Sequence, residues 1–132
     1  MEALGDIGDI KAIEPLINAL DSKYLCSAAA KSLGKLKVKK AVPKLIYLLQ
    51  DDSIDVRLAA IDALGKIRDE KAINPIIIMC ATDSDTKIRQ AAIKSLQEFN
   101  DVRANEVITK ALEDPDKDVR WIAMNTLNNI NN

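Results

Sequence analysis

The sequence predicts an all-α fold built from repeated pairs of helices, and its internal repetition is the main observation behind this prediction. A phrase of the form Leu-Gly-x-(Ile/Leu) stands at residues 4–7, 33–36 and 64–67, and weaker copies follow at 96–99 and 127–130. The steps between the phrase leucines are 29, 31, 32 and 31 residues, which is enough for two short helices and two turns. No segment alternates between apolar and polar residues for long enough to indicate a strand.

The first helix of each repeat is expected shortly after the phrase. Its copies cover Lys11–Leu20, Lys40–Leu49, Lys71–Ala81 and Ala104–Glu113. An aspartate that suits an N-cap precedes three of these helices, at Asp9, Asp69 and Asp101. A proline lies near the front of three of them, at Pro15, Pro43 and Pro75. Proline at this place either occupies the first turn or bends the helix, and we expect a bend.

The second helix of each repeat carries apolar residues at helical spacing. In the second repeat, Val56, Ala60, Ala63, Leu64 and Ile67 follow a period of about 3.6 residues. The second helices are expected to start at Cys26, Arg57, Arg89 and Arg120, four residues after the cap candidates Ser22, Ser53, Asp85 and Asp116. An alanine recurs at one equivalent position, Ala29, Ala60, Ala92 and Ala123. A small residue there lets neighbouring helices approach closely.

The length of 132 residues is typical of one domain with one core. We expect a single repeat domain over 1–132, with repeats near 3–31, 32–62, 63–94 and 95–125 and a short end at 126–132. The chain opens in the last third of a second helix, so the outer flank of the first complete helix has no cover. Either the chain is a piece of a longer array, or this N-terminal end packs against another molecule, self-association included.

Composition excludes several classes of function. Nineteen basic and twenty acidic residues give a net charge of -1, without the broad positive field of nucleic-acid binding, so no nucleic-acid partner is expected. The longest apolar run, Ile76–Ala81, is too short to span a membrane, and the acidic amino terminus does not resemble a secretory signal. Cys26 and Cys80 form no Cys-x-x-Cys pair, so both are expected to be reduced, buried thiols of a cytoplasmic protein.

The sequence offers little to catalysis. The chain contains no histidine, no glycine-rich phosphate loop and no carboxylates at metal-ligand spacing. We therefore expect no catalytic residue, no metal and no cofactor, and a protein that is not an enzyme in its own right.

Three stretches of the chain resemble a known family. Asp55-Val56-Arg57, Ala63–Ile67 and Ala12–Ile17 resemble the consensus of HEAT repeats of the short, phycobilisome-lyase-like type. The resemblance implies a right-handed α-α superhelix, a HEAT-like solenoid of about four helix pairs with a leading partial helix. The fourth repeat departs from the consensus by having Gln97 for glycine and Val107 for proline, and the first repeat has Cys26 where the others have arginine.

Acids and arginines recur at a fixed separation of six residues. The pairs are Asp51 with Arg57, Asp83 with Arg89, and Asp114 with Arg120. A row of such pairs can be interpreted as an anion site. The resemblance favours instead a structural ladder of hydrogen bonds between stacked repeats, since bidentate pairing with carboxylates suits arginine.

The resemblance also implies that the second helices line a concave groove. The partner-binding candidates are the residues opposite the apolar stripe of these helices: Lys31, Lys35, Leu58, Asp62, Lys66, Gln90, Lys94, Glu98, Trp121 and Asn125. Ordinary solvated surface is the alternative for any one of them. Leu58 and Trp121 stand out because a large apolar side chain on a polar face is a candidate hot spot. Trp121 has a second interpretation, as a cover for the end of the core.

The predicted function is a scaffold that binds a protein partner along this groove. The main alternative, from the resemblance, is a subunit of a bilin lyase or isomerase. A DNA-repair helical-repeat protein is a third reading, and the net charge of -1 argues against it. The identity of the protein partner does not follow from the sequence.

Overall fold

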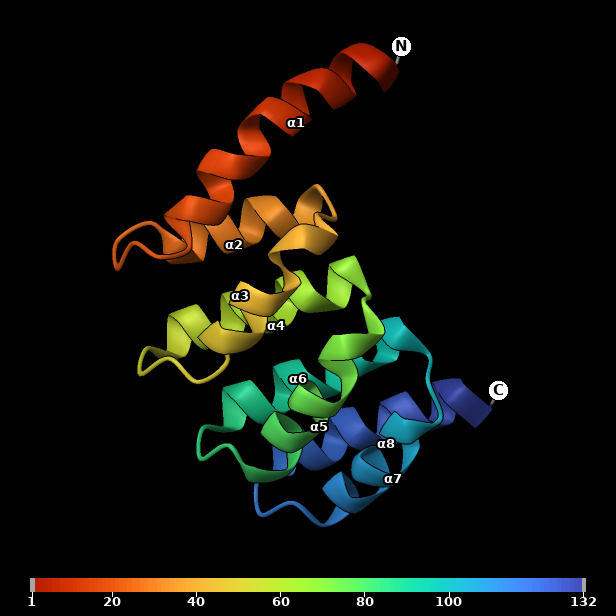
Figure 1. Ribbon diagram of the computed structural model, residues 1–132. Coiled ribbons are helices and arrows are strands. Elements are labelled where there is room, and N and C mark those ends of the chain that lie inside the picture. Colours follow the sequence, from red (N-terminus) through yellow and green to blue (C-terminus); the bar gives the residue numbers. More distant parts are fainter. Residues whose placement is uncertain (1, 132) are drawn as a thin grey trace. The chain divides into compact units, whose positions relative to one another are not determined.

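A computed structural model describes residues 2–131 of the chain and the side chains of residues 11–129. All regular structure within these residues is helical, which confirms the all-α prediction (Figure 1). The chain divides into two compact units, Met1–Ile67 and Arg68–Asn132. Each unit is described by itself below.

The first unit contains two successive helix pairs. Its elements are α1 (Glu2–Ala19), α2 (Cys26–Lys35), the 3-10 helix η1 (Lys39–Ala41), α3 (Val42–Leu48) and α4 (Ile54–Ile67). The second helices α2 and α4 pack against each other, α3 packs on α4, and α1 packs on α2. The side chains of Leu33, Leu45, Ile61 and Leu64 are fully buried between them and form the centre of the core.

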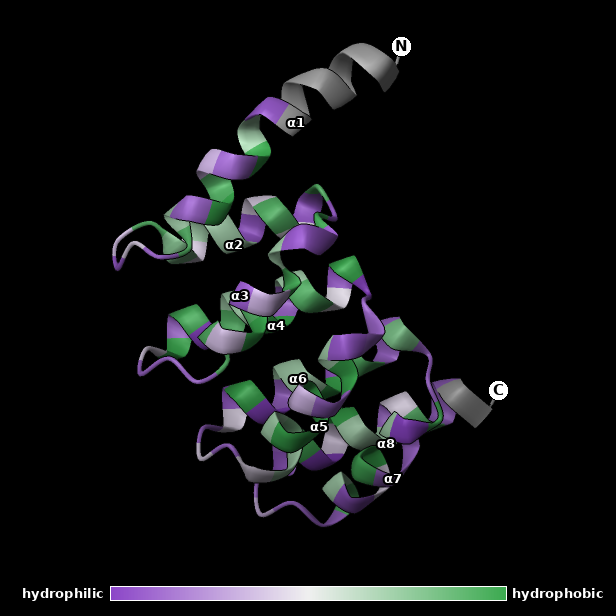
Figure 2. Cartoon of the chain, viewed as in Figure 1, coloured by the Kyte–Doolittle hydropathy of each residue, from purple (hydrophilic) through white to green (hydrophobic). Residues whose placement is uncertain are grey.

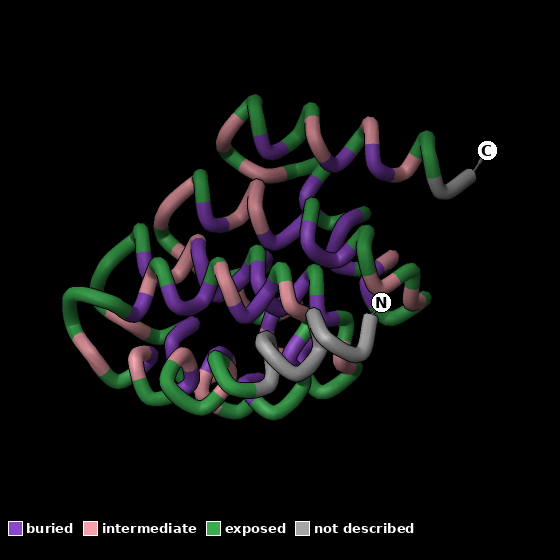
Figure 3. The backbone as a smooth tube through the Cα atoms, turned by 90° about the horizontal axis from the view of Figure 1, so that it is seen from above, coloured by how far each residue is buried: buried purple, intermediate pink, exposed green. Residues whose placement is uncertain are grey.

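The second unit repeats this arrangement. Its elements are the 3-10 helix η2 (Glu70–Ala72), α5 (Ile73–Thr82), α6 (Thr86–Phe99), α7 (Arg103–Lys110), the 3-10 helix η3 (Ala111–Glu113) and α8 (Lys117–Asn131). Helix α6 lies between α5 and α8, and α7 contacts α5 and α8. The core contains Ile76, Ile88, Ile93, Leu96, Ile108 and Val119, all fully buried. Each turn of α8 carries a buried residue on one side and exposed residues on the other, so one side of the helix faces this core (Figure 3).

The beginning of the chain differs from the prediction. Instead of a leading partial helix followed by a separate first helix, α1 is one continuous helix from Glu2 to Ala19. Asp9 therefore lies inside a helix and not before one, and its side chain is outside the described residues. A single glycine such as Gly8 lowers helix stability by about 1 kcal/mol, which does not end a helix unless other contacts favour a turn.

The second helices start earlier than predicted. Helices α4, α6 and α8 begin at Ile54, Thr86 and Lys117, directly after the residues proposed as caps. Asp85 accepts hydrogen bonds from the backbone N–H groups of Lys87 and Ile88, at 2.8 and 3.4 Å. Such a cap satisfies donors that have no partner within the helix, so the helix extends right up to it. Only α2 begins where expected, at Cys26, and without a side-chain cap.

Two of the three expected caps of the first helices are present, and the prolines lie in the first turn of α3 and α5 and inside α1. Asp69 and Asp101 each accept a hydrogen bond from the backbone N–H two residues later, at 2.9 and 2.8 Å. In the second and third repeats a 3-10 helix precedes the α-helix, and Pro43 and Pro75 lie in the first turn of α3 and α5. The first turn tolerates proline because its N–H groups have no intrahelical acceptor.

Small residues bring α2 and α4 together. Gly34 is buried, and a Cβ atom built on it would lie 2.8 Å from Cα of Ala63. The repeated alanines Ala29, Ala60, Ala92 and Ala123 are all buried, as the recurrence indicated. Apolar (green) and polar (purple) residues share each helix, as the helical spacing predicts (Figure 2).

Candidate functional site

The loops that join the first and second helices share one construction in the last three repeats. The carboxylates of Asp51, Asp83 and Asp114 each accept a hydrogen bond at 2.9 Å from the backbone N–H two residues later. The arginine six residues after each acid donates from Nη1 to the backbone carbonyl of that acid, at 2.6, 2.7 and 2.6 Å for Arg57, Arg89 and Arg120. Within a loop, therefore, the arginine binds the carbonyl oxygen of its acid.

One carboxylate pairs with an arginine of the preceding repeat. Arg89 on α6 donates from Nε and Nη2 to both carboxylate oxygens of Asp114, at 2.8 and 3.0 Å. Both side chains are largely buried, at 12 and 10% exposed. This two-point contact joins consecutive repeats of the second unit.

The electrostatics of this contact favour the ionised forms of both Arg89 and Asp114. Burial alone would raise the pKa of Asp114, but hydrogen bonds from Arg89 and from the backbone of Asp116 outweigh it and hold the pKa below its usual range. The hydrogen bond to Asp114 raises the pKa of Arg89. Both groups are therefore ionised at neutral pH, which makes this a structural ion pair and not a source of catalytic protons.

The predicted partner-binding residues are distributed over the second helices of both units. Those with exposed side chains are Lys31 and Lys35 on α2, Asp62 and Lys66 on α4, Lys94 and Glu98 on α6, and Trp121 on α8. Leu58, Gln90 and Asn125 are only partly exposed. Leu58 is therefore a weaker anchor candidate than the sequence indicated.

Trp121 is the most conspicuous apolar residue on this surface. Its side chain is 61% exposed, so it does little to cover the core. One turn further along α8, Met124 is 48% exposed, although its counterparts Ile61 and Ile93 are fully buried. Met124 is not among the predicted binding residues, because its place in the repeat predicts burial.

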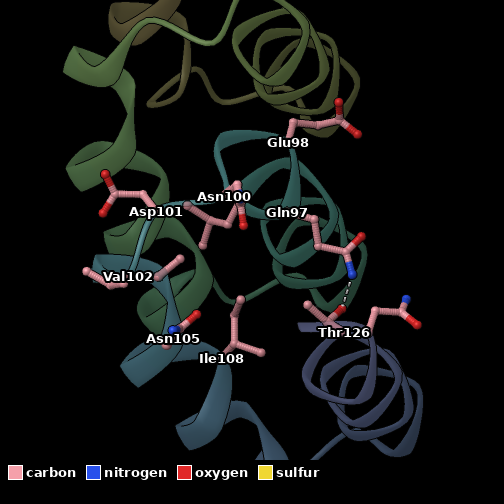
Figure 4. Close-up of a pocket in the computed structure, with 11 residues that line it drawn as sticks. Gln97, Glu98, Asn100, Asp101, Val102, Asn105, Ile108 and Thr126 are labelled. Carbon is pink, nitrogen blue, oxygen red and sulfur yellow. Dashed lines mark hydrogen bonds between the residues drawn. The ribbon is translucent and has the colours of Figure 1, made fainter. Parts of the chain in front are cut away.

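A pocket of about 500 Å³ lies in the second unit between the end of α6, α7 and α8 (Figure 4). Leu96, Ala104 and Ile108 contribute its apolar lining, and its carboxamides come from Gln97, Asn100, Asn105 and Asn129. Gln97, which replaces the consensus glycine, donates from Nε2 to Oγ1 of the buried Thr126 at 2.5 Å. Such neutral donors and acceptors suit a peptide or another uncharged polar ligand.

One of the charged residues of this pocket, Asp101, already forms an ion pair. Both carboxylate oxygens of Asp101 accept from the Arg103 guanidinium, each at 3.0 Å. This side-chain hydrogen bond lowers the pKa of Asp101. Of the residues that line this pocket, only Glu98 is among the predicted partner-binding residues. The signal for the others was the departure of the fourth repeat from the consensus at Gln97.

Reactive groups are scarce among the described side chains. Cys26 and Cys80 are both buried and unpaired with each other, and burial raises the pKa of the Cys80 thiol to about 11. No cluster of His, Cys, Asp or Glu within residues 11–129 has the arrangement of a metal site. Within the helices that the structure describes, none is long and apolar enough to cross a membrane.

The repeat geometry agrees with known protein families. A model of HEAT repeats matches residues 13–97 and 73–132. The chain belongs to the HEAT-repeat family. A model of the PBS lyase HEAT-like repeat matches residues 1–22, so the predicted resemblance is confirmed. Among curated proteins, no sequence matches this HEAT-repeat chain.

Solved structures show the same fold. The structure of the complex of CpcE and CpcF of phycocyanin lyase from Nostoc sp. PCC7120 is similar with a TM-score of 0.73 and 26% identity, over 91% of this HEAT-repeat chain and 53% of that one. This chain thus spans about half the length of that lyase chain. Two engineered proteins are similar in fold, with TM-scores of 0.67 and 0.69, at 23 and 22% identity. They cover 98 and 99% of this chain, which spans 66 and 40% of theirs.

Proposed function

We propose that this HEAT-repeat protein is a scaffold that binds a protein partner through the outward surface of its second helices. The observation that carries the proposal is the exposure of Trp121 and Met124 on α8. Aromatic residues and methionine are enriched in protein interfaces, and a tryptophan in such a place often contributes much of the binding energy.

Charged side chains on the neighbouring helices supply specificity. Lys94 and Glu98 are exposed on α6, which packs against α8. In the first unit Lys31, Asp62 and Lys66 are exposed on α2 and α4, which also pack together. Charges at the rim of an interface steer association and reject wrong partners more than they add affinity.

A pull-down from a lysate of the source organism tests this proposal. The test variant combines Trp121→Ala with Lys94→Glu, and retained proteins are identified by mass spectrometry. The control variant combines Ile78→Ala with Lys110→Glu on the first helices α5 and α7, where Ile78 is 59% exposed and Lys110 is exposed. The proposal predicts a protein retained by the wild type and the control but lost from the test variant. Equal retention by all three would contradict it.

A second candidate function is that of a subunit of a bilin lyase or isomerase. The similarity to the CpcE and CpcF complex and the match to the PBS lyase HEAT-like repeat favour it. The similar structure is a complex of two proteins, CpcE and CpcF, so we expect the activity to require a partner. Mixing the protein and its captured partner with a linear tetrapyrrole tests the idea. A lyase subunit should produce a new visible absorbance band, and an unchanged tetrapyrrole spectrum counts against this role.

A further inference from the structure

A second cavity, of about 930 Å³, lies in the first unit where the first arginine of the ladder would be expected. It is bounded by the end of α1, the start of α2, α3 and the start of α4. Cys26 and Asp51 both line it. These two residues are the repeat equivalents of Arg89 and Asp114, which pair in the second unit.

The backbone contacts of Asp51 are the same as those of Asp114, the acid that pairs with Arg89 in the second unit. The Asp51 carboxylate accepts from the Ser53 N–H at 2.9 Å, as Asp114 does from Asp116. Arg57 holds the carbonyl oxygens of Asp51 and Asp52 at 2.6 and 3.2 Å, as Arg120 holds those of Asp114 and Pro115. What differs is the preceding repeat, where the short thiol of Cys26 replaces a guanidinium.

The chemistry of the cavity complements a cation with a flat surface. Four carboxylates line it, from Asp21, Asp51, Asp52 and Asp55, against the two ammonium groups of Lys23 and Lys44. Lys44 is engaged by Asp21, at 2.8 Å. The ring of Tyr47 lines the same cavity and is 78% exposed. Carboxylates pair with guanidinium at two points, and an aromatic face attracts the same group.

We propose that this cavity receives an arginine side chain from a partner protein, which completes the ladder in place of the missing arginine. The site includes the first turns of α2 and α4, but none of the second-helix residues proposed above as partner-binding lines it, so the two sites are separate. We choose arginine as the occupant because Asp114, the counterpart of Asp51, binds the guanidinium of Arg89 in this same chain.

Nuclear magnetic resonance titration of the full chain with N-acetyl-arginine amide tests the proposal. The backbone N–H signals of residues 51–55 should shift on addition. The citrulline analogue, which has the same shape without the charge, should bind about tenfold more weakly or worse, because it lacks the charge-assisted contacts. The lysine analogue should also bind more weakly, since it cannot pair at two points. Equal shifts with all three compounds would overturn the proposal.

Two variants provide independent checks. Cys26→Arg should supply the guanidinium from within the chain, raise Tm and abolish the titration shifts. Asp51→Asn removes the negative charge that would bind the guanidinium and should weaken binding by about tenfold. This variant keeps the test valid even if the larger side chain in Cys26→Arg does not fit. Asp118→Asn, an exposed acid on α8 outside the cavity and outside the proposed binding surface, is the matched control and should bind like the wild type. Unchanged binding by Asp51→Asn, or an equal loss in Asp118→Asn, would refute the assignment.

Discussion

At the scale of single residues, three non-glycine residues adopt a backbone conformation in which glycine would be less strained. Lys37, Arg68 and Asn100 follow the ends of α2, α4 and α6 and have φ of 54, 58 and 50°. This left-handed conformation costs most residues about 1–2 kcal/mol, and asparagine tolerates it better than lysine or arginine. The recurrence of the turn at equivalent positions shows that the repeat dictates this backbone whatever residue is present.

Lys37→Gly should stabilise the protein by about 1 kcal/mol, because glycine adopts a positive φ without steric cost. The gain is reduced by the greater freedom of glycine in the unfolded chain. Lys31→Gly, an equally exposed change inside α2, should destabilise by about 1 kcal/mol. Urea unfolding of both variants measures these changes, and a loss of stability in Lys37→Gly would contradict the interpretation of the turn.

The pair formed by Arg89 and Asp114 predicts a defined pH dependence. Because the folded-state pKa of Asp114 is lowered, its contribution to stability is complete above the unfolded pKa of about 3.9 and is lost as the pH falls through the folded value. At pH 7, Asp114→Asn should cost about 2–3 kcal/mol, since a largely buried Arg89 loses its charged partner.

Urea unfolding at a series of pH values checks this prediction. The difference between the wild type and Asp114→Asn should be constant at neutral pH and shrink below about pH 4. Asp118→Asn, an exposed acid in the first turn of α8, is the control and should differ little from the wild type. A pH-independent difference between wild type and Asp114→Asn would show that the charge of Asp114 is not what stabilises the contact.

At the scale of helices, the sequence predicted the repeat register and most caps, because both depend on local residue types. It missed where α1 begins and where α4, α6 and α8 start. The later repeats predict a break near Gly8 and Asp9, yet these two residues alone do not stop a helix. The repeated arginines predict later starts for the second helices, whereas Ser53, Asp85 and Asp116 already serve as the caps.

The contact between α2 and α4 gives a test of helix packing. Gly34→Ala should destabilise the protein by about 1–3 kcal/mol, because the added Cβ would lie 2.8 Å from the backbone Cα of Ala63. This loss opposes the gain of about 1 kcal/mol that alanine normally brings to a helix. Ser32→Ala, a partly exposed change on the same helix, should stay within about 0.5 kcal/mol of wild type. Thermal unfolding distinguishes the two, and a stabilised Gly34→Ala would mean that the helices are not in close contact.

At the scale of the whole molecule, the family and the all-α architecture followed from the sequence, whereas the pockets did not. The apolar spacing and the repeated phrases determine which residues enter a core. A cavity depends instead on how side chains from several helices meet, as at Gln97 and Thr126, or on the absence of one side chain, as at Cys26. The exposure of Met124 was unpredictable for the same reason, since it depends on what covers α8.

Photocrosslinking to the captured partner tests the central claim, that the second helices form the binding surface, most directly. A photoreactive amino acid is placed at Asp62 and Lys94 on second helices, and at Asn74 and Glu106 on first helices; all four side chains are exposed. We predict that the partner is crosslinked from Asp62 and Lys94 and not from Asn74 or Glu106. Crosslinks only from Asn74 and Glu106 would contradict the claim and place the partner on the opposite helices.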